Sequence, residues 1–288
     1  MSGRGPAELL ELTGIALRVA EEAATLAQAG FRASPRVEEK GPHDLVTEFD
    51  RASEELLIAR LGALTPGIAV VGEEQSASRP TSSRGGLVWY VDPIDGTTNF
   101  VHGHPFWCVS VGLMDDDTPV AGAVVAPVLG IRWTGYMPRD AQPSGDGPAP
   151  AAAGEARRNG ERCAVSATTS LQHAMIATGF PPVRDRAPDN NFDAFITVKR
   201  NAQAVRRCGS AAIDLCMVAD GTYDAYWERR LHAWDIAAGS AIVRGAGGVI
   251  TGLDGRAADY HTGNIVASNG LVHAPIVALF SDKGSPAR

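Results

Sequence analysis

Trp89-Tyr-Val-Asp-Pro-Ile-Asp-Gly-Thr-Thr-Asn-Phe100 is the stretch from which the architecture of this chain can be worked out. A β-prone apolar run over residues 87–91 ends at Asp92 and Asp95, and a glycine and two threonines follow. Because proline fixes φ and glycine permits a positive φ, we expect a tight turn that points both carboxylates and several N–H groups at one spot. Carboxylates without histidine or cysteine suit a hard cation such as Mg²⁺, which commonly binds phosphate. The first hypothesis is a metal-assisted phosphate site.

Composition limits the classes of protein to which the chain can belong. It has 288 residues, 44% hydrophobic and 20% charged, which is typical of a globular protein with one large α/β domain or two closely joined ones. The formal net charge is −7 and no basic block occurs, so we expect no direct nucleic-acid binding. Net charge would not attract an anionic substrate, and bound cations would have to invert the local field.

Cysteine usage and the N-terminus favour a cytoplasmic protein. No C-x-x-C pair occurs, and no histidine lies at zinc-finger spacing from a cysteine, so we expect reduced and mostly buried thiols. The N-terminus has no apolar run long enough for a signal peptide or a membrane span. Residues 8–29 instead have the pattern of an amphipathic helix.

Periodicity and turn residues predict two sheets that helices flank and separate, in an α+β or α/β chain. Expected loops lie at 75–86 and 138–153, and a subdomain of residues 1–165 would carry most of the metal ligands while 166–288 completes the site. Expected helices are 8–29, one from Asp50 capped by Thr47 or Asp50, 191–201, 211–219 and 234–244. Expected strands are 44–50 in part, 68–71, 87–91, 108–114, 120–128, 130–136, 175–178, 204–207, 222–228 and 249–251.

Three further acidic residues can join the two aspartates of the motif. Glu73 follows the strand predicted before residue 87, and two strand ends on one edge of a sheet lie close together, so Glu73 can share a metal with Asp92. Asp235 and Asp50 each lie at the start of a predicted helix, where an N-cap is the alternative role. The triplet Asp115-Asp116-Asp117 is interpreted as a solvated hairpin turn and not as a metal site.

These residues suffice for phosphate chemistry with Mg²⁺. Asp92 is the natural bridge between two cations, of which one activates a water and the other stabilises the leaving oxygen. The N–H groups of Gly96 and Thr97, at an expected helix start, would bind phosphate oxygens. Thr97 would also hold the attacking water, with Asp50 accepting the threonine proton.

Five segments, which follow one another along the chain in the order typical of the family, resemble motifs of the inositol monophosphatase family. Asp92-Pro-Ile-Asp-Gly-Thr-Thr-Asn99 resembles its D-P-[ILV]-D-G-[ST] signature, and Trp234-Asp-Ile-Ala-Ala-Gly239 resembles its W-D-x-A-[AG]-G signature. The other segments are Asp44-Leu-Val-Thr-Glu-Phe-Asp50, Gly72-Glu-Glu74 and Gly209-Ser-Ala-Ala212, and the likeness extends to Gly247-Gly248 and to residues 159–166. It covers most of the chain, and a longer 138–153 segment is its main departure.

The resemblance implies a layered α-β-α-β-α sandwich of the sugar-phosphatase type, a homodimer, two or three Mg²⁺ ions per site and sensitivity to Li⁺. Asp50 and Thr97 would activate the water together with Glu73. The implied metal ligands are Glu73, Asp92, the carbonyl of Ile94, Asp95 and Asp235. The implied substrate contacts are Asp95, Gly96, Thr97, Ser210, Ala211, Glu228 and Asp235.

Myo-inositol monophosphate is the substrate that we expect. Glu228 with His232, three residues before Asp235, resembles the cyclitol-binding arrangement of inositol monophosphatases, although His232 can equally be a packing or surface residue. Histidinol phosphate, fructose 1,6-bisphosphate and 3′-phosphoadenosine 5′-phosphate are alternatives, because a shared scaffold cannot choose among them. A regulatory, protein-binding member of the family with little turnover is the alternative of a different class.

Overall fold

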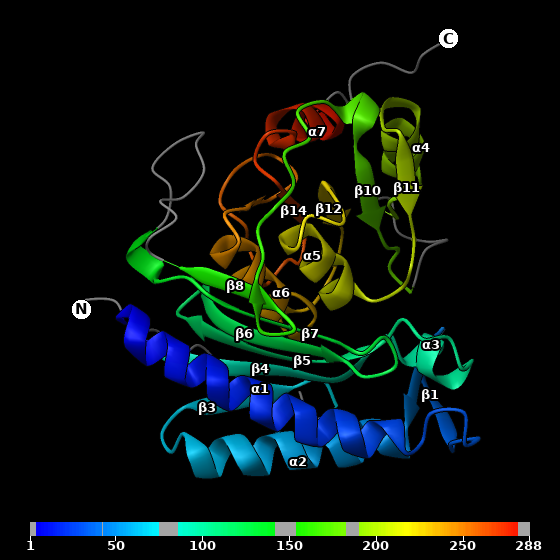
Figure 1. Cartoon of the computed structure of the whole chain (residues 1–288). Helices are drawn as coiled ribbons and strands as arrows, with labels where there is room; N and C mark the ends of the chain where they lie inside the picture. The colour runs from blue at the N-terminus through cyan, green and yellow to red at the C-terminus, as the bar shows by residue number, and fades with distance from the viewer. Residues whose placement is uncertain (1–3, 42, 75–85, 142–153, 183–189, 282–288) are drawn as a thin grey trace.

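The chain folds into five layers in the order helix, sheet, helix, sheet, helix (Figure 1). The structure is a computed structural model that describes residues 4–41, 43–74, 86–141, 154–182 and 190–281. The layered sandwich predicted from the sequence is therefore confirmed. No helix in these ranges is long and apolar enough to cross a membrane.

The larger sheet has seven strands in chain order, β3 to β9. Only β3 and β4 are parallel to each other, and the other neighbours are antiparallel. The strands are β3 (Ala69–Gly72), β4 (Leu87–Asp95), β5 (Cys108–Asp115), β6 (Thr118–Ala126), β7 (Ile131–Tyr136), β8 (Glu155–Arg158) and β9 (Glu161–Arg162). A separate ribbon pairs β1 (Val37–Gly41) with β2 (Asp44–Thr47).

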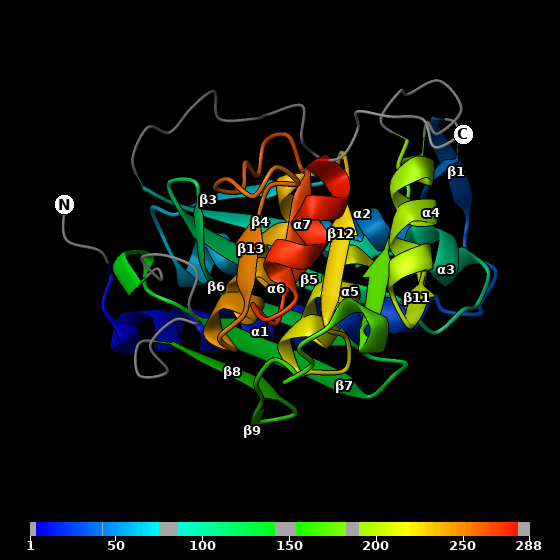
Figure 2. The same ribbon diagram turned by 90° about the horizontal axis from the view of Figure 1, so that it is seen from above.

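The smaller sheet has the order β11-β10-β12-β14-β13 and mixes parallel with antiparallel pairs. Seen from above, α4 and α7 lie across its outer face (Figure 2). Its strands are β10 (Met175–Thr178), β11 (Ala204–Arg206), β12 (Ala225–Glu228), β13 (Val249–Thr251) and β14 (Ile265–Ser268), and the covering helices are α4 (Phe192–Asn201) and α7 (His273–Ser281).

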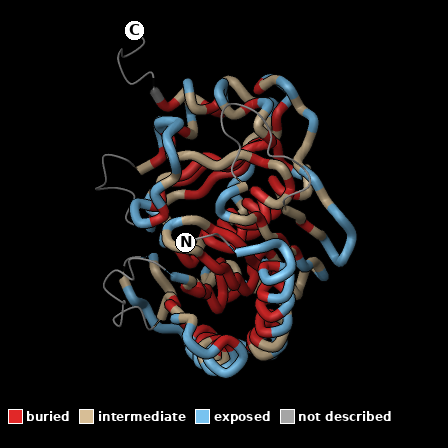
Figure 3. The backbone as a smooth tube through the Cα atoms, turned by 90° about the vertical axis from the view of Figure 1, so that its left-hand side faces the viewer, coloured by how far each residue is buried: buried red, intermediate tan, exposed pale blue. Residues whose placement is uncertain are grey.

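Three buried clusters hold the layers together. The helices α1 (Pro6–Gln28) and α2 (Glu48–Leu64) bury one face against the larger sheet and expose the other, as the colours of Figure 3 show. The helices α5 (Ala211–Ala219) and α6 (Ala233–Gly245) are buried between the two sheets. The third cluster lies between the smaller sheet, α4 and α7. Apolar burial on both faces of each sheet therefore stabilises the order of the layers.

Most of the predicted elements are present. All four cysteines are free, as expected, and the acidic triplet forms the hairpin between β5 and β6. Helix α2 begins at Glu48, two residues earlier than expected, because Thr47 caps it. Among the described residues, the strands and α-helices that the sequence did not predict are β1, β8, β9, β14 and α7. The expected loops at 75–86 and 138–153 lie almost wholly outside the described residues.

Helix α6 lies very close to the larger sheet because glycines face it. A Cβ built on Gly112 of β5 would be 2.4 Å from the backbone N of Ala238, and one on Gly122 of β6 would be 2.7 Å from its Cα. Such distances are far below van der Waals contact, so no side chain fits there. These two glycines therefore set the distance between α6, which carries Asp235, and the strands beside β4.

Gly112→Ala is expected to lower the free energy of unfolding by about 1–3 kcal/mol, because backbone must move to admit the methyl group. Gly62→Ala is the matched control, since Gly62 lies in α2 with no atom within 4 Å of its built Cβ. Helix propensity should make that control more stable, by up to about 1 kcal/mol. Urea unfolding measures both changes, and an unchanged Gly112→Ala protein would contradict the close packing.

Candidate active site

The site is centred on the carboxyl end of β4, which departs from the tight turn that we predicted. The strand continues through Pro93 to Asp95, and the register shifts between Asp92, paired with Ser110, and Asp95, paired with Cys108. Two residues of β4 thus face one residue of β5, which is a β-bulge, and bulges redirect side chains. The backbone N of Ile94 donates a hydrogen bond to Asp92 Oδ1 over 3.0 Å. The bulge, and not a turn at Pro93, sets the directions of the two carboxylates.

Gly96 reverses the chain into a short helix, α3 (Thr97–Val101), as the sequence predicted. Its φ of +97° lies in the left-handed region, and a Cβ there would be 3.1 Å from the carbonyl oxygens of Phe106 and Gly209. Asn99 Nδ2 binds the same segments, at 2.6 Å from the Phe106 oxygen and 2.9 Å from that of Cys208. Asn99 was quoted in the motif, but its role was missed. It fixes α3 to the segment that leads into α5.

The predicted pair of Asp50 and Thr97 is present. Thr47 caps α2, and its backbone N and hydroxyl donate to Asp50 Oδ2 at 2.8 and 2.5 Å. The other oxygen, Oδ1, lies 3.1 Å from Thr97 Oγ1, which is also 3.0 Å from the carbonyl oxygen of Ile94. The single hydroxyl proton of Thr97 can serve only one of these acceptors at a time. Asp50 is thus the third residue of α2 and not its N-cap, and its Oδ1 faces Thr97.

Glu73 follows β3, which is parallel to β4, so it lies at the predicted edge of the sheet. Lys40, on β1, had no role in the sequence interpretation. Its Nζ lies 2.6 Å from Glu73 Oε1 and 2.8 Å from Glu74 Oε1. Glu74 N in turn donates to the buried Glu54 carboxylate over 2.8 Å. The ammonium group of Lys40 therefore neutralises part of the acidic cluster.

Asp235 reaches the site from the first turn of α6, but not as the N-cap. The helix begins at Ala233 with His232 as N-cap, and the backbone N of His232 donates to Asp235 Oδ2 over 2.6 Å. The N-cap alternative for Asp235 is thus wrong, because His232 is the N-cap. His232 is exposed and stacks on the ring of Trp234 with centroids 4.6 Å apart.

Asp95 joins the two halves of the site. Its Oδ2 accepts hydrogen bonds from Ser210 Oγ and from the backbone N of Ala212, both at 2.7 Å. Ser210 is the N-cap of α5, with its oxygen also 3.3 Å from Ile213 N. These contacts hold the start of α5 against the end of β4. They bring Ser210 and Ala211 to the motif, as the substrate assignment requires.

Glu228 ends β12 on the smaller sheet and is buried. The hydroxyl of Tyr226 donates to its Oε2, and a Cβ on Gly179 would come within 2.1 Å of the same oxygen. The adjacent Asp214 of α5 is also buried, and its Oδ1 has no hydrogen-bond partner among the described residues. Asp214 was not predicted as a site residue, since one aspartate in an apolar helix carries no motif.

Burial and mutual repulsion raise the pKa values of these acids. For Asp92 and Asp235 the pKa lies well above the ordinary range, first through burial and then through neighbouring carboxylates, Glu73 and Asp95 among them. Burial also raises the pKa of Asp50 and of Asp95 to about 6, although hydrogen bonds to each lower it. Glu228 is raised to about 7 by burial. Concentrated negative charge of this kind favours a bound cation.

The donor set fits a hard cation by type and charge. In the described parts of the chain, no three Asp, Glu, His or Cys side chains are yet placed closely enough to hold a metal ion. Each carboxylate has a protein partner instead: Lys40 for Glu73, Ile94 N for Asp92, Ser210 for Asp95 and His232 N for Asp235. Coordination through Glu73 Oε1 requires that oxygen to leave Lys40. All the donors are oxygens, which Mg²⁺ prefers over nitrogen and sulfur.

The sequence and the fold are similar to those of known proteins over nearly the whole chain. The model of the inositol monophosphatase family matches residues 8–285. The chain belongs to this family. The inositol-1-monophosphatase of Synechocystis is 39% identical over 239 residues, 83% of this chain and 77% of that protein. Nus factor SuhB of Pseudomonas aeruginosa is 36% identical, covering 90% of this chain and 91% of that protein. Inositol monophosphatase from Anabaena has a TM-score of 0.80 at 31% identity, covering 95% and 96% of the two chains.

Membership of the inositol monophosphatase family confirms two conclusions drawn from the sequence. The chain is a phosphoric monoester hydrolase, and its layered fold is that of the family's solved structures. The individual roles of the residues around β4 remain predictions, because similarity over the whole chain tests none of them singly.

Stability without metal should fall as pH rises through 7. The folded protein holds the Glu228 proton up to about pH 7, whereas the unfolded chain releases it near pH 4.3. The folded state therefore binds more protons between these values, and raising the pH from 6.5 to 8 costs about 1 kcal/mol at this one residue. Glu228→Gln removes that cost and should flatten the profile.

The measurement is urea unfolding in EDTA at pH 6.5 and 8.0. Glu55→Gln is the control, since Glu55 is an exposed residue of α2 and should leave the wild-type slope unchanged. Equal slopes for Glu228→Gln and wild type would show that Glu228 does not carry a raised pKa.

Proposed function

We propose that the chain hydrolyses myo-inositol monophosphate to inositol and phosphate with Mg²⁺. The main support is the cluster of buried carboxylates around the end of β4, beside the Thr97 hydroxyl, which is hydrogen-bonded to Asp50. A cluster of like charges is costly to bury unless cations accompany it, and a phosphate ester can then bind to those cations. Membership of a phosphatase family supports the same activity.

The chemistry assigned to Mg²⁺ is activation of a water and stabilisation of the leaving oxygen. The residues that we assign to hold two or three ions are Glu73, Asp92, the Ile94 carbonyl, Asp95 and Asp235. Asp92 would hold both ions, because the charges of Glu73, Asp95 and Asp235 all act on its carboxylate.

Asp50 and Thr97 orient the nucleophile, assisted by Glu73. With a pKa of about 6, Asp50 is mostly ionised at neutral pH and can accept the hydroxyl proton of Thr97. The Thr97 oxygen then offers a lone pair to a water proton and directs the water toward the phosphorus. Buried hydrogen bonds from Thr47 hold Asp50 in place, so little reorganisation is needed.

Phosphate and alcohol bind on different elements. We assign binding of the phosphate oxygens to the backbone N–H groups of Gly96 and Thr97, at the start of α3. Glu228 accepts hydroxyl hydrogens of the cyclitol, and the Ser210–Ala211 segment contacts the same ring. Because Asp95 holds Ser210 Oγ, the serine acts on the substrate through its position at the start of α5. Asp95 and Asp235 would contact the substrate in addition to holding the ions.

The same scaffold suits histidinol phosphate, fructose 1,6-bisphosphate or 3′-phosphoadenosine 5′-phosphate. A regulatory role with little turnover is favoured by one observation, the likeness to Nus factor SuhB. The complete carboxylate set argues for catalysis instead. We further propose that the protein is a cytoplasmic homodimer, that Li⁺ inhibits it, and that it does not bind nucleic acid directly.

A phosphate-release panel with Mg²⁺ tests the substrate. It should contain inositol 1-phosphate, histidinol phosphate, fructose 1,6-bisphosphate and 3′-phosphoadenosine 5′-phosphate, and the highest kcat/KM is expected for inositol 1-phosphate. Asp92→Asn should lose turnover by at least about a thousandfold while unfolding at a higher temperature in EDTA, because it removes one buried repelling charge. No release from any ester would favour the regulatory role, and an active Asp92→Asn protein would contradict the assignment of Asp92.

A further inference from the structure

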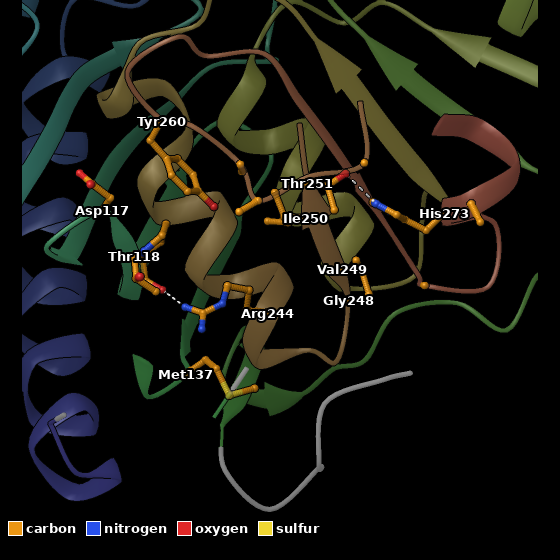
Figure 4. Close-up of a pocket in the computed structure, with 16 residues that line it drawn as sticks. Asp117, Thr118, Met137, Arg244, Gly248, Val249, Ile250, Thr251, Tyr260 and His273 are labelled. Carbon is orange, nitrogen blue, oxygen red and sulfur yellow. Dashed lines mark hydrogen bonds between the residues drawn. The ribbon is translucent and has the colours of Figure 1, made fainter. Parts of the chain in front are cut away.

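A cavity of about 530 Å³ lies away from the carboxylate cluster, beside the C-terminal end of α6. The start of β6 with Asp117 before it, strand β13, and the segment that contains Ala257, Ala258 and Tyr260 line it (Figure 4). Arg244 lies in the last turn of α6, nine residues after Asp235, which is about 13 Å along the helix. A volume of this size is typical of small-molecule sites.

The charge in this cavity is unbalanced. Arg244 is only 7% exposed, and its Nη1 donates to the carbonyl oxygen of Pro119. Its Nη2 has no hydrogen-bond partner and its guanidinium no ion pair among the residues that the structure describes. Figure 4 shows the guanidinium group directed from α6 toward Thr118, in the lining of the cavity. A buried cation without a counter-charge is costly, so a bound anion would stabilise it.

The other lining groups limit the kind of anion. His273 is bonded through Nε2 to Thr251 Oγ1 and through Nδ1 to Ser268 Oγ, and burial lowers its pKa to about 4, so it is neutral at pH 7. Asp117 is the acidic residue of the lining, and it disfavours a second negative charge on a ligand. Val249, Ile250 and Ala258 give apolar surface. One cation with an apolar wall suits a ligand with one negative charge and an apolar body.

We propose that this cavity binds a small organic acid, whose carboxylate pairs with the guanidinium group of Arg244 and whose apolar part lies against β13. A guanidinium group is the usual partner of a carboxylate in a partly apolar setting. The site is separate from the proposed phosphatase site, since the two lie at opposite ends of α6.

Ligand binding to the full chain in EDTA tests the proposal, and it does not depend on phosphatase activity. The probes are butyrate and benzoate, with benzamide as the neutral counterpart and inorganic phosphate as the multiply charged one, each titrated by calorimetry or saturation-transfer NMR. Saturable one-to-one binding of butyrate or benzoate is expected, at least tenfold tighter than that of benzamide or phosphate. Arg244→Met should weaken it tenfold or more, whereas Arg60→Met, on exposed α2, should leave it unchanged.

Ala258→Phe, which adds volume to the lining and keeps Arg244, gives a second test if Arg244→Met fails to fold. It should abolish benzoate binding while the circular dichroism spectrum stays that of wild type. Absence of saturable binding, equal binding of benzamide or phosphate, or binding that both variants retain would overturn the proposal.

Discussion

Repulsion among buried carboxylates is the constraint on which the rest of this molecule depends. Asp92, Asp95 and Asp235 come from two elements that are far apart in the chain, and burial with mutual repulsion raises their pKa values. Such a cluster opposes folding unless packing elsewhere compensates for it. Apolar burial on both faces of both sheets supplies that compensation. The electrostatic repulsion that remains among these carboxylates favours binding of cations.

Hydrogen bonds and close packing around the carboxylates fix their positions. Asp95 holds the start of α5 through Ser210 and Ala212, and Asn99 ties α3 to the segment before α5. Gly112 and Gly122 let α6 approach the sheet so closely that Asp235 can face β4. The buried carboxylates therefore lie on packed strands and helix starts, where little movement is possible.

The sequence predicts the long strands and the start of α3 better than it predicts the edges of the fold. Strands β5, β6 and β7 are long and apolar, and Gly96 specifies the start of α3 through its positive φ. Strands β1, β8 and β9 were missed because they are short and mostly charged, so they have no alternation to detect. The bulge at Asp92 was taken for a turn, since proline and glycine are typical of both. Lys40 and Asp214 take part only through tertiary contacts, which no local pattern records.

Anomalous scattering from a crystal soaked in Mn²⁺ tests the central claim most directly, because it locates the ions without reference to turnover. We expect at least two peaks at the Asp92 carboxylate, one also beside Glu73 and one also beside Asp235, with Glu73 turned away from Lys40. A crystal with full Mn²⁺ occupancy at other sites, no peak at Asp92, and the contact between Lys40 and Glu73 intact would contradict it.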